Sequence, residues 1–259
     1  MSLEASTKTF TQCGFLKPFW ARRVGPPWVL SLLIFAFAVS IRFFVMFSPW
    51  PLQELFFAQT IAVCASPFIF LTPAGRLQIG LSDRDVAFIT MLLSVVTGAA
   101  CGFLFFAAGM RIYGLSPDNW CISVRNYLHL EEMRGLFPPL GLFALYALPA
   151  IFLAPIAEEI LFRGLIQESF ARRFNPTVAT CVNSVLFGLL YLYLHGVWQD
   201  HRGFHIRLVS AALAALLMAC IGGIFTLFRS RFGSLWPAMA AHAGFNLGLL
   251  AATIRQFAR

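Results

Sequence analysis

Charged residues are scarce in this chain of 259 residues. Asp, Glu, Lys and Arg together make up 12% of it, whereas 59% of the residues are hydrophobic. A soluble domain carries about 25% charged residues. A single soluble core could not bury 29 Phe and 6 Trp side chains. The composition therefore excludes an ordinary soluble globular protein and predicts an integral membrane protein.

The sequence also lacks several patterns that mark particular chemistries. Its six cysteines are scattered and form no Cys-x-x-Cys pair, which argues against a disulfide framework and a thiolate zinc site. There is no His-Glu-x-x-His of a zinc protease and no Gly-x-Ser-x-Gly nucleophile elbow. No pair of aspartates lies inside apolar stretches. These absences argue against zinc-, serine- and aspartate-based hydrolysis.

The net charge is +8, with 19 Lys and Arg against 11 Asp and Glu. A basic chain often binds nucleic acid. Here, however, the basic residues form short clusters between apolar runs, as they do in the cytoplasmic loops of membrane proteins. The expected partner is therefore membrane lipid and no nucleic acid is expected. The sequence leaves the oligomeric state open.

Seven apolar stretches are long enough to cross a hydrocarbon layer, which requires about 20 residues per helix. They are residues 28–47, 55–72, 86–110, 136–157, 176–197, 208–228 and 235–254. The predicted fold is all-α, a polytopic transmembrane bundle of about seven to eight helices. Four prolines in the fourth stretch predict a kinked or broken helix there. A re-entrant or amphipathic helix at residues 158–174 would be the eighth.

The distribution of basic residues between alternate loops favours a cytoplasmic N-terminus. We expect residues 1–135 to form an N-terminal transmembrane region, with a cytoplasmic tail and about three spans. Residues 136–259 would form the helix bundle that carries the site, and both regions would pack as one membrane domain. The first ten residues lack the order of a cleavable signal, so the first span is expected to be retained. Arg42 interrupts that span and is expected to reach toward a lipid headgroup.

Ionisable residues inside apolar stretches usually mark function, because each costs roughly 2.5–3.5 kcal/mol in the membrane. One group is Glu158, Glu159 and Arg163 at the end of the fourth stretch. On a helix Glu159 and Arg163 lie one turn apart and can form an ion pair, whereas Glu158 points about 100° away. Glu158 is therefore the candidate general base on water. The alternative is an ordinary helix end with an exposed salt bridge.

Two further groups lie in later stretches. His242 and Asn246 share one helix face in the seventh stretch. They predict either an oxyanion-binding pair or a hydrogen-bonded contact between helices. Tyr191 and His195 lie at spacing four near the end of the fifth stretch. Either side chain could orient a water or donate to an oxyanion, and the alternative is an interfacial aromatic belt.

Together these groups resemble the CPBP family, the CAAX prenyl endopeptidase and bacteriocin-processing group of intramembrane proteases. The first motif of that family, Glu-Glu-x-x-x-Arg, matches Glu158, Glu159 and Arg163. Its last motif, His-x-x-x-Asn, matches His242 and Asn246. The resemblance covers about residues 136–252, which is under half of the chain. The two motifs in the correct order are much more specific than either one alone.

The middle motif of the family, Phe-x-x-x-His, is only partly matched. It begins at Phe187, but the histidine position holds Tyr191, and His195 lies one turn further along the same face. In the family this histidine is thought to help the first glutamate activate water. Either His195 replaces it, or Tyr191 has a changed role. The departure also favours, as an alternative, a non-proteolytic member of the family.

The resemblance implies an intramembrane endopeptidase that hydrolyses a peptide bond in a membrane-anchored protein or peptide. Glu158 would be the general base, with Glu159 and Arg163 holding the geometry. His242 and Asn246 would stabilise the oxyanion. This mechanism requires Glu158, His242 and Asn246 to meet around one pocket. The localisation expected is a multi-pass membrane protein, in the plasma or inner membrane if the source is bacterial.

No cofactor is expected for this mechanism. A zinc site built from Glu158, Glu159, His195 and His242 is the less favoured alternative, since catalytic zinc takes three nitrogen or oxygen ligands from the protein. Two other functions remain open. One is a non-catalytic scaffold or immunity protein. The other is a transporter, because transporters also carry polar groups in broken helices, although no inverted repeat is visible in the sequence.

Overall fold

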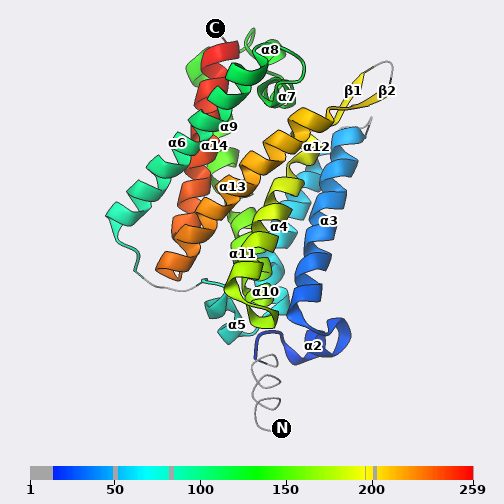
Figure 1. Ribbon diagram of the computed structural model, residues 1–259, viewed down its shortest axis with the longest axis vertical. Helices are drawn as coiled ribbons and strands as arrows, with labels where there is room; N and C mark the ends of the chain where they lie inside the picture. The colour runs from blue at the N-terminus through cyan, green and yellow to red at the C-terminus, as the bar shows by residue number, and fades with distance from the viewer. Residues whose placement is uncertain (1–13, 49–51, 82–84, 196, 201–202, 259) are drawn as a thin grey trace.

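The computed structural model describes residues 14–48, 52–81, 85–195, 197–200 and 203–258 as a bundle of long helices (Figure 1). Among them, five helical runs are long and apolar enough to cross a membrane, namely α3 Pro27–Phe47, α6 Phe88–Tyr113, Pro139–Arg173, α13 Leu208–Phe232 and α14 Trp236–Phe257. Two shorter apolar helices lie beside them, α4 Gln53–Phe70 and α11 Pro176–Leu190. These seven elements correspond to the seven predicted stretches. The predicted helical membrane bundle is confirmed.

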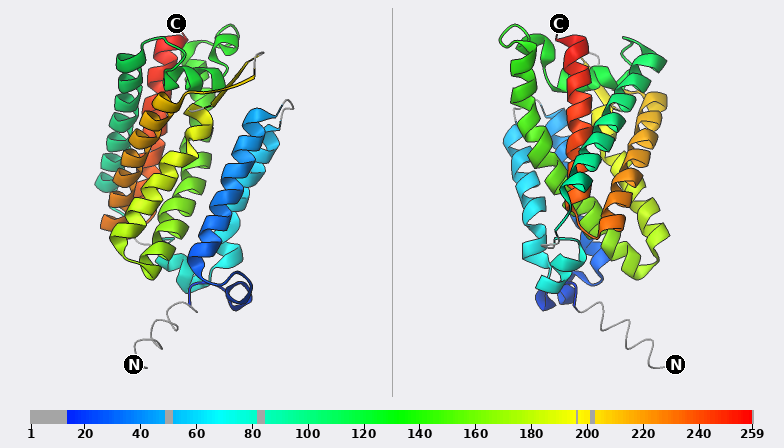
Figure 2. Two further views of the ribbon diagram at one scale, coloured as in Figure 1. Left: turned by 45° about the vertical axis from the view of Figure 1, so that its right-hand side comes forward. Right: turned by 90° about the vertical axis from the view of Figure 1, so that its left-hand side faces the viewer.

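The other described elements are short and lie at the two ends of the bundle. They are α2 Pro18–Val24, α5 Pro73–Gln78, α7 Trp120–Tyr127, α8 Leu130–Met133, α12 Leu192–His195, β1 Val197–Asp200 and β2 Gly203–Ile206. The two strands pair antiparallel as a hairpin outside the helices, a small departure from the all-α prediction. Elements α2 and α5 lie at one end, and α7, α8 and the hairpin lie at the other (Figures 1 and 2). The long helices therefore alternate in direction, as membrane crossing requires.

The fourth apolar stretch was predicted to be kinked or broken, and the structure shows that it is not broken. It is one continuous helical run made of α9 Pro139–Glu159, the π-helix η1 Ile160–Ile166 and α10 Gln167–Arg173. The run continues through Pro149 and Pro155, so the separate helix predicted at residues 158–174 is wrong. In a bundle, neighbouring helices and local adjustments can satisfy the backbone groups that proline frees. The irregularity is instead a π-helical segment, which often occurs at functional sites.

Helix α14 is the central helix of the bundle, and most of its residues are buried. Helix α6 packs along it at a very short distance. A Cβ atom added at Gly98 would overlap the carbonyl oxygen of Ala241, and one added at Gly248 would overlap the carbonyl oxygen of Ala99. Small residues allow membrane helices to approach this closely. The contact fixes the rotation of α14 and therefore the direction in which its polar side chains point.

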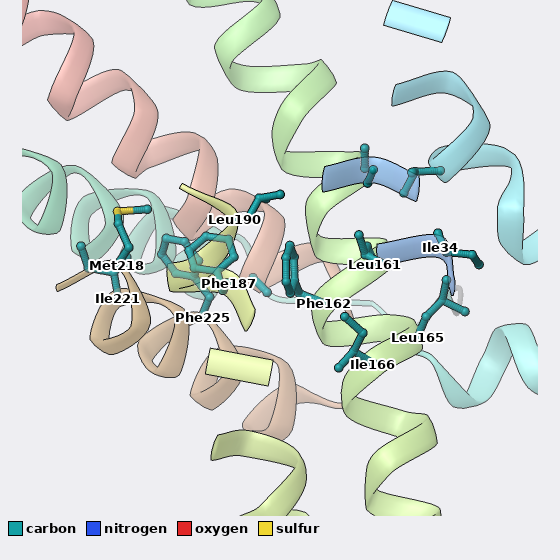
Figure 3. Packing of buried hydrophobic residues seen from close by; sticks show 14 of the residues in the cluster. Ile34, Leu161, Phe162, Leu165, Ile166, Phe187, Leu190, Met218, Ile221 and Phe225 are labelled. Carbon is teal, nitrogen blue, oxygen red and sulfur yellow. The ribbon is translucent and has the colours of Figure 1, made fainter. Parts of the chain in front are cut away.

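Aromatic side chains fill the centre of the bundle. Phe162 of η1, Phe187 of α11 and Phe225 of α13 pack against one another (Figure 3), with ring centroids 5.1 Å apart for Phe162 and Phe187 and 6.0 Å apart for Phe187 and Phe225. Other large apolar side chains, such as Phe37 and Leu104, are exposed on the outside. An apolar outer surface of this kind suits contact with lipid.

Helix α3 forms hydrogen bonds with η1 and α10. The hydroxyl of Ser31 lies 3.1 Å from the carbonyl oxygen of Leu165 in η1 and 3.0 Å from the hydroxyl of Ser169 in α10. Ser31 and Ser169 are both buried. Hydrogen bonds between buried polar groups hold membrane helices together. The first long helix is thus anchored beside the π-helical segment.

We expect Gly98→Ala to destabilise the bundle, because the added methyl group would force α6 and α14 apart. Gly223→Ala in α13 is the matched control, since its Cβ would meet only the Ser184 hydroxyl, at 3.7 Å. Overpacking costs about 1–3 kcal/mol, whereas alanine is favoured over glycine inside a helix by about 1 kcal/mol. Thermal unfolding in detergent should show a lower Tm for Gly98→Ala alone. Equal Tm values for both variants would contradict the close approach.

Candidate active site

The end of α9 and the start of η1 place three charged side chains inside the bundle. The guanidinium of Arg163 donates to Oε1 of Glu159 over 2.8 Å, and neither side chain is exposed. A second guanidinium nitrogen donates to the carbonyl oxygen of Gly222 on α13, also over 2.8 Å. The predicted ion pair is therefore present. Complete burial excludes the alternative of an exposed salt bridge at a helix end.

His242 of α14 is joined to the same carboxylate. Its Nδ1 lies 2.8 Å from Oε1 of Glu159, and because an ionised carboxylate has no hydrogen to donate, Nδ1 is the donor. The imidazole stacks on Phe225, with centroids 5.1 Å apart. This leaves Nε2 as the nitrogen that can react. It lies 3.7 Å from Oε2 of Glu158.

Glu158 is buried as well, and both of its oxygen atoms have partners. Oε1 lies 2.8 Å from the guanidinium of Arg42 on α3. Oε2 accepts a hydrogen bond of 3.0 Å from the hydroxyl of Tyr191, at the end of α11. Four elements that are far apart in the sequence therefore meet at this carboxylate, namely α3, α9, α11 and α14.

Arg42 is the residue that sequence reasoning placed wrongly. Its predicted position at a lipid headgroup is contradicted, because its side chain is 3% exposed and pairs with Glu158. An arginine within an apolar stretch needs either a path to the headgroups or a buried anion. The sequence could not choose between the two, since nothing in it relates residue 42 to residue 158. The need of a buried arginine for an anionic partner was the only signal in the sequence that could have indicated this contact.

Tyr191, rather than His195, contacts the candidate base. The Tyr191 hydroxyl bonds to Glu158, whereas the imidazole of His195 stacks on the Tyr191 ring, with centroids 6.1 Å apart, and lies against Phe105. Among the described residues, Nδ1 of His195 has no hydrogen-bond partner. His195 thus lies behind Tyr191. The tyrosine occupies the position at which the resembled family has its histidine.

Among the described residues, Asn246 forms no hydrogen bond with the charged cluster. Its amide nitrogen donates to the carbonyl oxygen of Ala150 on α9, over 2.8 Å. Ala150 lies about 12 Å along the helix from Glu158, at about 1.5 Å per residue. The contact between helices that the sequence left open is therefore present. An amide nitrogen carries two hydrogens, so this bond uses one of them.

The side chains that were expected to share a pocket are closed off from solvent. Glu158 is 3% exposed and His242 is fully buried. A cavity of about 360 Å³ lies elsewhere, lined by residues that include Arg125, Arg207 and Phe257. The charged cluster is therefore closed in this structure, and a ligand must displace neighbouring groups to reach it.

Within the described part of the chain, no group of three or more His, Cys, Asp or Glu side chains is placed to hold a metal ion. Of the four residues that the zinc alternative requires, His195 lies behind Tyr191. Glu158 and Glu159 accept from Arg42 and Arg163. A mechanism without a cofactor stays a prediction.

The comparison with protein families agrees with the geometry. A family described as type II CAAX prenyl endopeptidase Rce1-like matches residues 140–248. Residues 140–248, called the Rce1-like region below, are therefore similar to that family. The match confirms the resemblance found in the motifs and supports an integral membrane protein of the CAAX protease type. No curated protein and no solved structure matches the chain.

The Rce1-like region contains both glutamates, Arg163, Tyr191, His242 and Asn246, but it does not contain Arg42. Two guanidinium groups and two carboxylates thus neutralise one another in the cluster, and one of these four groups comes from outside the matched region. Burying two carboxylates without cations would be strongly unfavourable.

We expect Arg163→Gln to reduce the free energy of unfolding by about 3–5 kcal/mol, because it leaves a buried carboxylate without its cation. Arg172→Gln is the matched control: Arg172 pairs with Glu168 at the same spacing, but both side chains are 20–25% exposed. That loss should stay below about 1 kcal/mol. Unfolding in detergent, followed by tryptophan fluorescence, measures both values. Equal losses would argue against a desolvated pair at Glu159.

Proposed function

We propose that this protein is an intramembrane endopeptidase of the glutamic type, which hydrolyses a peptide bond in a membrane-anchored protein or peptide. The observation that carries the proposal is the placement of His242 between two carboxylates. Glu159 holds one imidazole nitrogen, and the other faces Glu158 at 3.7 Å. That distance is too long for a direct hydrogen bond. A water molecule that bonds to both groups needs them about 4.5 Å apart, so a small movement of either side chain would admit it.

In the proposed reaction, Oε2 of Glu158 accepts a proton from this water as its oxygen attacks the peptide carbonyl carbon. The C–N bond then breaks, and the proton passes from Glu158 to the leaving amine. The products are a carboxylic acid and an amine, so no cofactor enters the balance. Burial of the Glu158 side chain inside the bundle keeps competing water away from it.

The developing oxyanion would be stabilised by His242, which donates through Nε2 once it is protonated. A carboxylate bound to the other nitrogen stabilises such an imidazolium, and Glu159 is in that position. The family resemblance assigns a second donor to Asn246. The hydrogen that its amide does not give to Ala150 would fill this role after the substrate enters.

A non-catalytic scaffold is the second candidate function. Two observations favour it: Tyr191 replaces the family's histidine, and both oxygens of Glu158 already have partners. A scaffold would keep its cellular function when Glu158 and His242 are both replaced by glutamine. Loss of that function, with normal protein levels, would exclude this candidate.

We expect Glu158→Gln to abolish cleavage, by at least about 100-fold, because the amide cannot accept the proton from water. Glu168→Gln is the matched control, since Glu168 lies further along the same helical run and pairs with Arg172 instead of with the charged cluster. Mass spectrometry of membrane peptides, from cells that make each variant at equal levels, measures cleavage. Normal cleavage by Glu158→Gln would remove Glu158 as the base.

We expect Tyr191→Phe to lower cleavage roughly 10- to 100-fold, which corresponds to a lost hydrogen bond to a charged group. Tyr191→His restores the residue of the family motif and should keep cleavage within a few-fold of the native level. The same peptide assay measures both variants. If Tyr191→Phe cleaves at the native rate, the hydroxyl has no part in the reaction.

A further inference from the structure

Arg42 is the charged residue of the cluster that the family comparison does not cover. It lies in α3, within an apolar stretch, and its side chain is 3% exposed. Its guanidinium lies 2.8 Å from Oε1 of Glu158, whose side chain is 4% exposed. An ionised arginine at this depth is costly unless an anion and further polar groups surround it. The burial therefore indicates a specific role for the contact.

Helix α4 holds the arginine in place from its other side. Nε of Arg42 lies 3.4 Å from Oε1 of Gln59, which is buried, and its guanidinium lies 5.3 Å from the centroid of the Phe56 ring. One side of the guanidinium thus contacts α4 and another contacts the carboxylate. A side chain whose conformation is fixed by its neighbours holds its partner in a defined position.

The charges explain why Glu158 needs this particular cation. Glu159 has Arg163 at 2.8 Å, and that guanidinium also binds the Gly222 carbonyl. Among the described residues, Arg42 is the one arginine that forms an ion pair with Glu158. Without it, a carboxylate buried among apolar groups would favour the protonated form, which cannot accept a proton from water.

We infer that Arg42 is a positioning residue for the proposed base, holding Oε1 of Glu158 so that the ionised Oε2 faces Tyr191 and His242. This inference rests on the proposed function. It means that the Rce1-like region is incomplete by itself, and that α3 and α4 of the N-terminal region supply a part of the site. Arg42 contacts the proposed base directly, so it acts through Glu158.

The inference predicts a change in the dependence of cleavage on pH. The groups that face Glu158 are Arg42 from α3, Tyr191 from α11 and His242 from α14. Tyr127 of α7 is also within electrostatic range: burial raises the pKa of its hydroxyl, Arg42 lowers this pKa and Glu158 raises it. Glu159 and Arg163, on the same helical run, form their own pair. Only Arg42 among these carries a permanent positive charge at hydrogen-bond distance from Glu158.

The test measures kcat/KM against pH in proteoliposomes, with a membrane peptide identified as cleaved by the native protein. Arg42→Gln should move the acidic limb of the profile upward by about one pH unit or more, because ionising Glu158 then requires a higher pH. Activity should recover at alkaline pH, with kcat changed more than KM. Arg42→Lys keeps the charge, so its acidic limb should stay closer to the native one.

Arg229→Gln is the matched control, because Arg229 binds the carbonyl oxygens of Gln78 and Ile79, away from the site. Its acidic limb should not move. A uniform loss of activity in Arg42→Gln, with an unmoved limb, would overturn the inference. If Glu158→Gln itself still cleaves, the proposed function fails. If Glu158→Gln is inactive but Arg42→Gln has the native profile, only the role of Arg42 fails.

Arg42→Gln could also fail to fold, and a second comparison then decides. The double variant Arg42→Gln with Glu158→Gln removes both charges together, so it should regain a folded state and a higher Tm than the single variant. Recovery supports the pairing of Arg42 with Glu158. A double variant as unstable as the single one would overturn it.

Discussion

The structure depends on the mutual neutralisation of four buried charges. Glu158 and Glu159 lie side by side at a depth where a lone carboxylate would be very costly, and Arg42 and Arg163 compensate them. The two arginines come from different parts of the fold. Arg163 lies one turn further along the same helical run, and Arg42 lies on α3. The cluster can exist only if the helices that carry it are packed in one arrangement. Charge compensation thus links the chemistry of the site to the fold.

The packing of the other helices positions these charged side chains. The close approach of α6 and α14 at Gly98 and Gly248 fixes the rotation of α14, and so directs His242 toward the carboxylates. Rings from η1, α11 and α13 surround Arg163, and the nearest of them, Phe187, lies 4.3 Å from its guanidinium. These rings make the surroundings of the ion pair apolar, which strengthens the electrostatic contacts there. The π-helical segment joins the carboxylates to Arg163 without interrupting the run.

At Tyr191 the candidate site differs from the family that it resembles. At the position of the family's histidine, a tyrosine hydroxyl donates to Oε2 of Glu158, and a hydroxyl cannot carry a positive charge as an imidazole can. The arginine on α3 supplies the positive charge beside this glutamate instead. The N-terminal helix α3 therefore contributes a residue to the charged cluster. The closed state of the cluster implies that substrate entry must move a contact on Glu158 or His242.

The sequence by itself determined the membrane bundle, the positions of its seven apolar helices, and the pair of Glu159 and Arg163. These features depend on composition or on spacing within one helix, and both can be counted along the chain. The motifs also selected Glu158 and His242 correctly as neighbours, because the family resemblance carries information about distant parts of the chain.

Only the tertiary structure decided the partners that join different helices. It placed Arg42 on Glu158 instead of at a headgroup, gave the contact with Glu158 to Tyr191 instead of His195, and joined Asn246 to the backbone of α9. It also showed that Pro149 and Pro155 do not break the fourth helix. Such outcomes depend on helix rotation and on which surfaces pack together. Both are set by contacts between residues far apart in sequence, for which a single chain read alone has no periodic signal.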